Sequence, residues 1–154
     1  MKKRVKWKVL IACLIIVYLV AGVGSVFTSN VKTSWYQIIK PSITPPNYVF
    51  PIVWNVLFLL IAFSLYFAWI NSDKKQKKKI KLIFGINFFL NILWSVLYFQ
   101  MRNPLYAFYE LFFLLISIAL MIFITYKINK KSSYLLIPYL LWVSFAGILN
   151  YLSI

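Results

Sequence analysis

The stretch VLIACLIIVYLVAGVGSVFT, residues 9–28, contains no charged side chain and is almost entirely apolar. A helix needs about 20 predominantly apolar residues to cross the hydrocarbon core of a bilayer, and this stretch is long enough. Four further apolar stretches follow it, at residues 49–70, 80–100, 104–126 and 134–151. The sequence therefore predicts an all-α membrane protein, a five-transmembrane-helix bundle. We expect residues 1–154 to form one integral membrane domain.

The composition supports the same fold class. Of the 154 residues, 63% are hydrophobic and only 12% are charged, and the mean hydropathy is +0.84. A soluble domain is roughly half apolar and a quarter charged. The first stretch follows a basic segment and ends in small residues, as a signal peptide does, but signal peptides have a shorter apolar run of about 7 to 15 residues. We therefore expect it to remain as a helix.

The chain is strongly basic, with 17 lysines and arginines and a net charge of +15. These residues lie at the ends of the apolar stretches, which orients a membrane protein and suits contact with anionic headgroups of the lipid bilayer. The basic loops are short and contain no recognition element, so nucleic acid is not an expected partner. Most basic residues fall on one predicted side, namely Lys2, Lys3, Arg4, Lys6, Lys8, Lys74, Lys75, Lys77, Lys78, Lys79, Lys81, Lys127, Lys130 and Lys131.

The opposite predicted side carries only Lys32, Lys40 and Arg102. The positive-inside rule then places the N-terminus in the cytoplasm and the first loop and the C-terminus outside. We expect a bacterial cell membrane as the location. The chain has no histidine, and Cys13 is its single cysteine, so a metal site built from the usual nitrogen and sulfur ligands is not expected. No cofactor is required by any motif.

Polar and aromatic side chains inside the predicted spans share helix faces. In the third span Asn87, Asn91 and Trp94 are spaced i, i+4 and i+7, and in the second span Trp54 and Phe58 lie one turn apart. In the fifth span, the same spacing groups Pro138, Trp142, Phe145 and Leu149. Such faces line a pocket for a flat, mostly apolar ligand, or they hold neighbouring helices together. The residues alone leave both interpretations open.

Glu110 is the only acidic residue inside a predicted span. A carboxylate within a membrane helix usually faces an interior, where it can serve as a proton or cation site, as in small multidrug transporters. The alternative is a structural carboxyl, protonated or hydrogen-bonded, with Tyr106 one turn away. We favour the structural interpretation, because no second acidic residue or buried basic partner is available to form a relay.

The first connection, at about residues 29–48, is long for so small a bundle. Pro41, Pro45 and Pro46 stiffen it and exclude a regular helix through that stretch. Trp35 and Tyr36 add apolar surface that favours burial. Two interpretations fit, a lid over the mouth of the bundle or a loop that packs at the membrane interface.

The chain resembles the tryptophan-rich sensory protein family, which includes the mitochondrial translocator protein, a peripheral-type benzodiazepine receptor. The resemblance covers nearly the whole chain. It is carried by Trp35-Tyr36, Lys40-Pro41, Pro45-Pro46, Phe50-Pro51, Trp54, Asn91, Trp94, Pro138-Tyr139, Trp142, Phe145 and Leu149-Asn150-Tyr151.

The resemblance implies a homodimer of five-helix bundles, each with a pocket open toward the first loop. It implies binding of porphyrins, such as protoporphyrin IX and haem, and of benzodiazepine and isoquinoline-carboxamide ligands. The pocket residues that it implies are Trp54, Phe58, Asn87, Asn91, Trp94, Trp142, Ser144 and Phe145, with Trp35, Tyr36 and Pro45 closing the pocket from the loop.

Three functions follow from this resemblance. The first is an integral membrane receptor or sensor of porphyrins. The second is light-dependent degradation of protoporphyrin, for which Trp54 and Trp142 are the candidate reactive groups, since no acid–base pair or nucleophile is visible. The third is transport of porphyrin or another amphipathic compound. Relatives often have an acidic residue at the position of Glu110, which makes a dedicated transport role for it less expected. Tyr151 is followed by no basic residue, so the sterol motif of animal relatives is incomplete.

Overall fold

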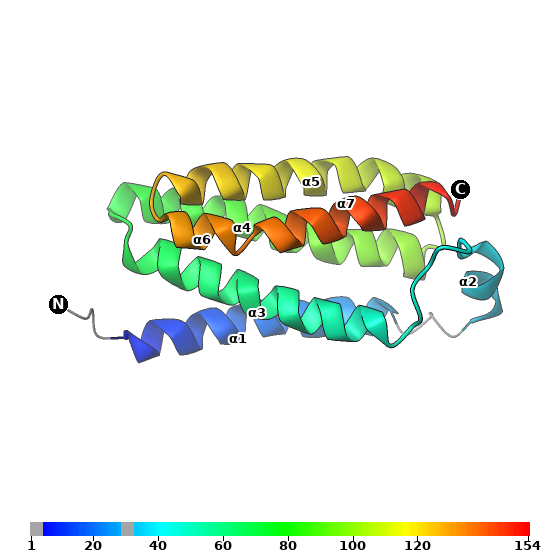
Figure 1. The fold of residues 1–154 in the computed structure, drawn as a ribbon, viewed down its shortest axis with the longest axis horizontal. Helices are drawn as coiled ribbons and strands as arrows, with labels where there is room; N and C mark the ends of the chain where they lie inside the picture. Colours follow the sequence, from blue (N-terminus) through cyan, green and yellow to red (C-terminus); the bar gives the residue numbers. More distant parts are fainter. Residues whose placement is uncertain (1–4, 29–32) are drawn as a thin grey trace.

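Five long apolar helices run along one another in the computed structural model, which describes residues 5–28 and 33–154 (Figure 1). Lys2, Lys3, Arg4 and Lys32, which contributed to the charge asymmetry, lie outside the described residues. The spans are formed by α1 (Trp7–Phe27), α3 (Val49–Ile70), α4 (Lys74–Ser95) with the π-helical turn η2 (Val96–Gln100), α5 (Pro104–Tyr126), and α6 (Lys130–Tyr134) followed by α7 (Ile137–Tyr151). The predicted five-helix membrane bundle is confirmed.

Helix α4 begins six residues earlier than the predicted span, because a capping box starts it in the lysine-rich connection. The Gln76 amide donates to Asp73 Oδ1 at 2.7 Å, and the Asp73 amide donates to Gln76 Oε1 at 2.9 Å. These reciprocal bonds satisfy amides that a helix start leaves without partners. The basic connection is therefore helical and extends the third span at one end of the bundle.

The fifth span is divided into two helices, where the sequence predicted one helix over residues 134–151. Asn129 caps α6 by accepting from the Ser132 amide at 3.1 Å, and the chain turns at residues 135–136 before α7 begins. Pro138 lies in the first turn of α7, where its missing N–H removes no helical hydrogen bond. The Ser132 hydroxyl also donates to the Ser64 carbonyl of α3 at 2.7 Å, which fixes α6 against the bundle.

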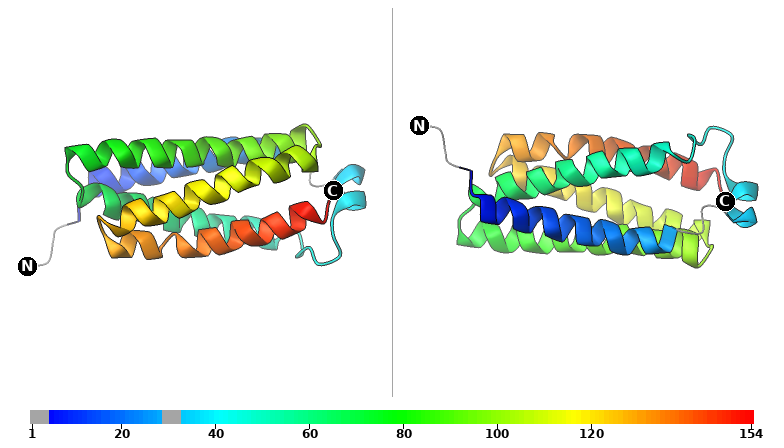
Figure 2. Two further views of the ribbon diagram at one scale, coloured as in Figure 1. Left: turned by 90° about the horizontal axis from the view of Figure 1, so that it is seen from above. Right: turned by 90° about the horizontal axis from the view of Figure 1, so that it is seen from below.

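The connection between α4 and α5 is a tight hairpin turn, as the three residues between the predicted spans 80–100 and 104–126 require. Arg102 adopts a left-handed conformation with φ of 51° within it. Asn103 then caps α5 by accepting from the Tyr106 amide at 3.1 Å. α4 and α5 consequently run antiparallel and pack along their length (Figures 1 and 2).

The first connection contains a short helix, α2 (Ser34–Ile39), that the sequence did not predict. It ends before Pro41, and residues 41–48 contain no helix, so the predicted effect of the prolines is confirmed. Figure 1 shows α2 beyond the ends of the spanning helices, at the end of the bundle opposite the start of α1. We call this end the α2 end.

Candidate ligand-binding pocket

A cavity of about 670 Å³ lies inside the bundle near the α2 end. Its volume falls within the range of small-molecule sites, roughly 300 to 1,000 Å³. All five spans and the first connection contribute to its wall. The lining residues are Tyr18, Ala21, Gly22, Gly24, Ser25, Thr28, Tyr36, Pro41, Thr44, Asn47, Phe50, Pro51, Trp54, Asn55, Phe58, Asn91, Trp94, Ser95, Tyr98, Phe99, Leu111, Leu114, Trp142, Val143, Ala146, Leu149 and Asn150.

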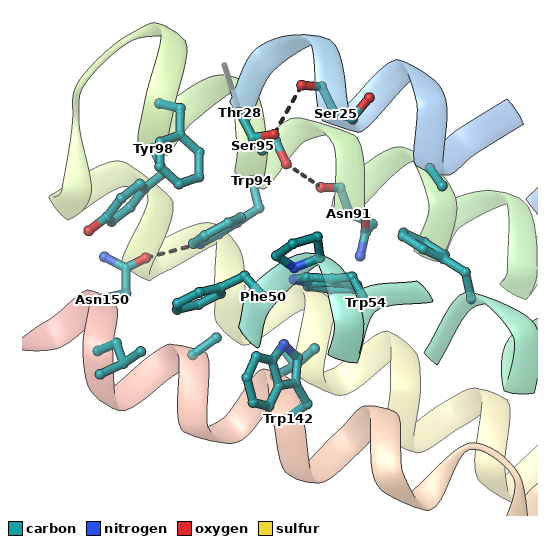
Figure 3. A pocket seen from close by; sticks show the side chains of 18 of the residues that line it. Ser25, Thr28, Phe50, Trp54, Asn91, Trp94, Ser95, Tyr98, Trp142 and Asn150 are labelled. Atoms are coloured by element: carbon teal, nitrogen blue, oxygen red, sulfur yellow. Dashed lines mark hydrogen bonds between the residues drawn. The ribbon is translucent and has the colours of Figure 1, made fainter. Parts of the chain in front are cut away.

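Aromatic side chains form facing parts of this wall. Trp54 stacks on Phe58 with ring centroids 5.3 Å apart, and Trp142 meets Phe50 edge to face at 5.8 Å. Figure 3 shows Phe50, Trp54 and Trp94 around one space, with Trp142 facing them from α7. None of the described lining residues is a lysine, arginine, aspartate or glutamate. The cavity therefore suits an apolar, aromatic ligand surface.

Behind the wall, a buried polar network fixes the amide of Asn91. Asn91 Nδ2 donates to the Tyr139 hydroxyl at 3.1 Å, and that hydroxyl donates to Asn87 Oδ1 at 3.2 Å. Asn87 Nδ2 then donates to Ser117 Oγ at 2.8 Å. The two asparagines of the third span thus serve both interpretations: Asn87 joins α4 to α5 and α7, whereas Asn91 also lines the cavity.

A second polar contact holds Trp94 in the wall. Its indole N–H donates to Asn150 Oδ1 at 3.0 Å (Figure 3). Asn150 Nδ2 in turn donates to the Pro104 carbonyl at 2.7 Å. The Trp94 ring stacks on Tyr98 at 5.1 Å, with 19° between the ring planes. Asn150 is fully buried, so its hydrogen bonds join α4, α5 and α7 at the α2 end.

The α2 helix closes this end through aromatic contacts with η2. Tyr36 is buried against Tyr98 and Phe99, with ring centroids 6.5 and 5.7 Å away. Burial raises the pKa of Tyr36 to about 12, and the neighbouring Tyr98 phenol adds to the rise. Trp35 meets Tyr98 at 6.0 Å, and the Arg102 guanidinium lies 6.0 Å from the Trp35 ring centroid. The arrangement agrees with the lid interpretation.

The sequence model of the TspO/MBR family matches residues 12–153 of this chain. The chain belongs to the TspO/MBR family. It is 38% identical to the tryptophan-rich protein TspO of Archaeoglobus fulgidus over 92% of both chains. It is 36% identical to that of Chlorobaculum tepidum, over 90% of this chain and 89% of the relative. It is 28% identical to the human translocator protein, over 84% of this chain and 78% of the relative.

Six of the residues that the family resemblance implied for the pocket and its lid line the cavity, namely Tyr36, Trp54, Phe58, Asn91, Trp94 and Trp142. The other five, in the part of the chain that the structure describes, are not in its wall. Trp35 packs on Tyr98, and Asn87 belongs to the buried network. Ser144 is exposed and donates to the Leu140 carbonyl of its own helix. Phe145 packs on Trp142 at 5.7 Å, and Pro45 lies in the connection after α2. Contact of any of these residues with a ligand stays a prediction.

Several lining residues of this TspO/MBR protein were missed by the sequence reasoning. Phe50 precedes Trp54 by one helical turn, so the spacing used for Trp54 and Phe58 was sufficient to find it. Tyr98 and Phe99 both turn inward because η2 is π-helical, and a 3.6-residue period does not predict that. The α1 contribution, with Gly22 and Ser25, gave no signal in the sequence.

Glu110 is buried beside the cavity but is not part of its described wall. Neither carboxyl oxygen has a hydrogen-bond partner among the described residues. Tyr106, which we expected to assist it, is largely exposed on α5 instead. The structural interpretation therefore loses the partner that we assigned, and the buried carboxyl has no hydrogen-bond partner in the part of the chain that the structure describes.

Trp35 is expected to hold α2 on the bundle. Replacing it with alanine removes its contacts with Tyr98 and Arg102, so the amides of α2 are expected to exchange with solvent at least about tenfold faster, which corresponds to about 1.4 kcal/mol. Hydrogen exchange with mass spectrometry measures this effect. Ile38→Ala is the matched control, since Ile38 is highly exposed on the same helix. Equal exchange in both variants would show that Trp35 does not anchor the lid.

Proposed function

We propose that this TspO/MBR protein is a membrane receptor or sensor that binds porphyrins, protoporphyrin IX or haem, in the cavity at the α2 end. The observation that supports this most is a cavity whose described lining carries no charged side chain and has indole rings on facing walls, Trp54 on α3 and Trp142 on α7. Aromatic rings stack in offset or edge-to-face arrangements on a flat macrocycle. A cavity of about 670 Å³ provides the space for such a ligand.

The polar atoms of the cavity support a ligand with hydrogen-bond acceptors. The indole N–H groups of Trp54 and Trp142 make no hydrogen bond to another described side chain, so both can donate to a ligand carbonyl. This feature fits the carboxamide of isoquinoline-type ligands and the lactam of benzodiazepines. The propionates of a porphyrin find no cation in the described wall, and the nearest basic residue in sequence is Lys40, beside the lining residue Pro41.

The orientation and assembly form part of the same proposal. The lysine-rich end of the bundle lies in the cytoplasm, and the α2 end and the C-terminus lie outside, since basic loops are retained on the cytoplasmic side. The cavity, near the α2 end, then lies in the outer half of a bacterial cell membrane. The assembled form is a homodimer.

The test is a titration of the purified protein in detergent with protoporphyrin IX in the dark, followed through the porphyrin absorbance and tryptophan quenching. We expect saturable binding of one porphyrin per chain. Excess isoquinoline carboxamide should displace it, because both ligands occupy the same cavity. A linear, non-saturating response would show that the porphyrin only partitions into the detergent micelle, and it would contradict the proposal.

A second candidate, light-dependent degradation of protoporphyrin, rests on the position of Trp54 and Trp142 in the cavity wall. The excited porphyrin can take one electron from an adjacent indole, and dioxygen takes that electron from the reduced porphyrin as superoxide. The indole radical and superoxide then oxidise the macrocycle, which restores the indole. Illumination of the complex that consumes several equivalents of porphyrin per chain would establish turnover. Consumption that stops at one equivalent would leave the receptor as the function. Transport of porphyrin, the third possibility, would require flux in proteoliposomes, and Glu110→Gln tests its coupling to protons.

A further inference from the structure

Helix α1 packs firmly along only one half of its length. Leu10, Cys13 and Val17 are buried in its first half. In its second half, toward the α2 end, Gly24 is the one buried residue among those described. A Cβ built on Gly24 would lie 4.0 Å from Ser95 Oγ, so this half of α1 leans on α4. Its side toward α3 is left without buried contacts.

The contact between α1 and α3 weakens at the same level. The two helices are antiparallel, joined at one end by the Lys6 amide donating to the Tyr66 hydroxyl at 3.0 Å and further along by the Tyr18 hydroxyl donating to the Asn55 carbonyl at 3.4 Å. Continuing this pairing by one turn places Gly22 opposite Pro51. A Cβ at Gly22 would meet no atom of the described residues within 4 Å. The right-hand view of Figure 2 shows α1 and α3 separating toward the α2 end.

The cavity reaches the space between these separated halves. Six residues on the two helices both line it and lie at this seam, namely Tyr18, Ala21, Gly22, Ser25, Pro51 and Asn55. All but Ala21 are exposed. Hence the wall of the cavity between α1 and α3 is thin and incomplete, whereas the α2 end is filled by the rings of Tyr36, Tyr98 and Phe99.

The polar residues at this seam are unusual for a surface that faces lipid. Ser25 donates to the Gly22 carbonyl at 2.7 Å and Asn55 Nδ2 donates to the Pro51 carbonyl at 2.9 Å, so each hydrogen bond returns to its own helix. Neither bond holds α1 against α3. Polar groups inside a membrane span typically face a cavity or mark a substrate pathway, because exposure to hydrocarbon is costly.

We propose that the crevice between the α2-end halves of α1 and α3 is a portal through which a hydrophobic or amphipathic ligand dissolved in the bilayer enters the cavity sideways. The proposal rests on the proposed function, since it needs a ligand that binds in the cavity. Gly22 and Pro51 frame the opening, and the contact between Tyr18 and Asn55 is its lower edge. The ligand reaches Trp54 and Trp142 without displacement of α2.

The decisive variant is Gly22→Phe, which fills the opening with a ring where the structure has room for it. Protein in vesicles is mixed with vesicles loaded with protoporphyrin IX, and association and dissociation rates are measured by stopped-flow quenching. Both rates are expected to fall by at least about tenfold, since entry and exit pass the same barrier. Because Gly22 also lines the cavity, the portal is judged by the two rates, and any change in equilibrium affinity is expected to be smaller than the change in either rate. Gly85→Phe is the matched control, because a Cβ at Gly85 on α4 also meets nothing within 4 Å, and Gly85 does not line the cavity.

Unchanged rates in Gly22→Phe, or a weaker affinity without slower association, would overturn the portal. A ligand-independent measurement separates this result from failure of the proposed function. Cys13→Ser with Ala146→Cys places the single thiol in the cavity wall on α7, and its labelling by a bulky, lipid-soluble pyrene maleimide is timed. If wild type binds no porphyrin, the proposed function fails. The portal then stands if Gly22→Phe slows labelling relative to Gly85→Phe, and it falls if the two variants label equally.

Discussion

Replacing Trp54 and Trp142 together with phenylalanine will weaken protoporphyrin IX binding by about a hundredfold, and each single replacement will weaken it by about tenfold. Phenylalanine keeps the contacts of these positions with Phe58 and Phe50 but removes one ring of each indole and its N–H group. The bundle should therefore remain intact while the wall recedes from the ligand on two sides. Isothermal calorimetry or porphyrin absorbance measures the effect without relying on tryptophan fluorescence.

The control for this experiment is Trp69→Phe. Trp69 lies on the same helix as Trp54 but at the lysine-rich end, where the ammonium groups of Lys77 and Lys81 are 5.4 and 5.6 Å from its ring centroid. Its replacement should leave porphyrin affinity unchanged. If the double variant of Trp54 and Trp142 keeps wild-type affinity, the porphyrin binds elsewhere on the protein. If Trp69→Phe reduces the affinity equally, the loss reflects a general effect of indole removal.

The spans were predictable because their physical cause is local. A run of about 20 apolar residues between basic clusters can be stable only across a bilayer, whatever its neighbours do. The boundaries were less predictable where a side chain acts on the backbone. The capping pair Asp73 and Gln76 lengthens α4, and Pro138 starts α7 after a turn. Both signals are present in the sequence, but the length of an apolar run does not reveal them.

For the cavity, helical spacing shows which side chains face inward but not which of them reach the cavity. Helical spacing identified Trp54, Phe58, Asn91 and Trp142 as inward-facing, and all four line the cavity. The spacing could not separate Asn87, one turn from Asn91, because the Tyr139 hydroxyl lies between their amides and draws Asn87 into the helix interface. Which of two residues on one face meets a cavity depends on neighbouring helices.

The wall contributed by α1 escaped prediction for a related reason. Gly22 and Ser25 contribute to the cavity because they are small and leave space beside them. A single sequence does not reveal where such a contact between helices is absent. η2 escaped it because one extra residue in a turn changes which side chains face inward. Both features concern the α2 end, where the bundle is least regular. The regular half at the lysine-rich end follows the expected pattern.

Asn150→Leu is expected to lower the stability of the bundle by about 2 kcal/mol, because it removes two hydrogen bonds that join helices in a largely apolar interior. The Trp94 indole N–H loses its acceptor and the Pro104 carbonyl loses the donor that Asn150 adds, while leucine retains a similar volume. Thermal or dodecyl sulfate unfolding followed by circular dichroism measures the change. Ser144→Ala on the same helix is the control, since its hydroxyl is exposed and bonds only to its own helix.

A double-mutant cycle tests whether the loss comes from this network. Trp94→Phe removes the indole donor, so in that background Asn150→Leu removes only the hydrogen bond to the Pro104 carbonyl and should cost about 1 kcal/mol less. Additive losses would mean that Trp94 and Asn150 contribute independently and that their contact is incidental. Coupled losses would tie the cavity wall to the junction of α4, α5 and α7. The orientation of Trp94 in the pocket would then be maintained by the same hydrogen bonds that hold these helices together.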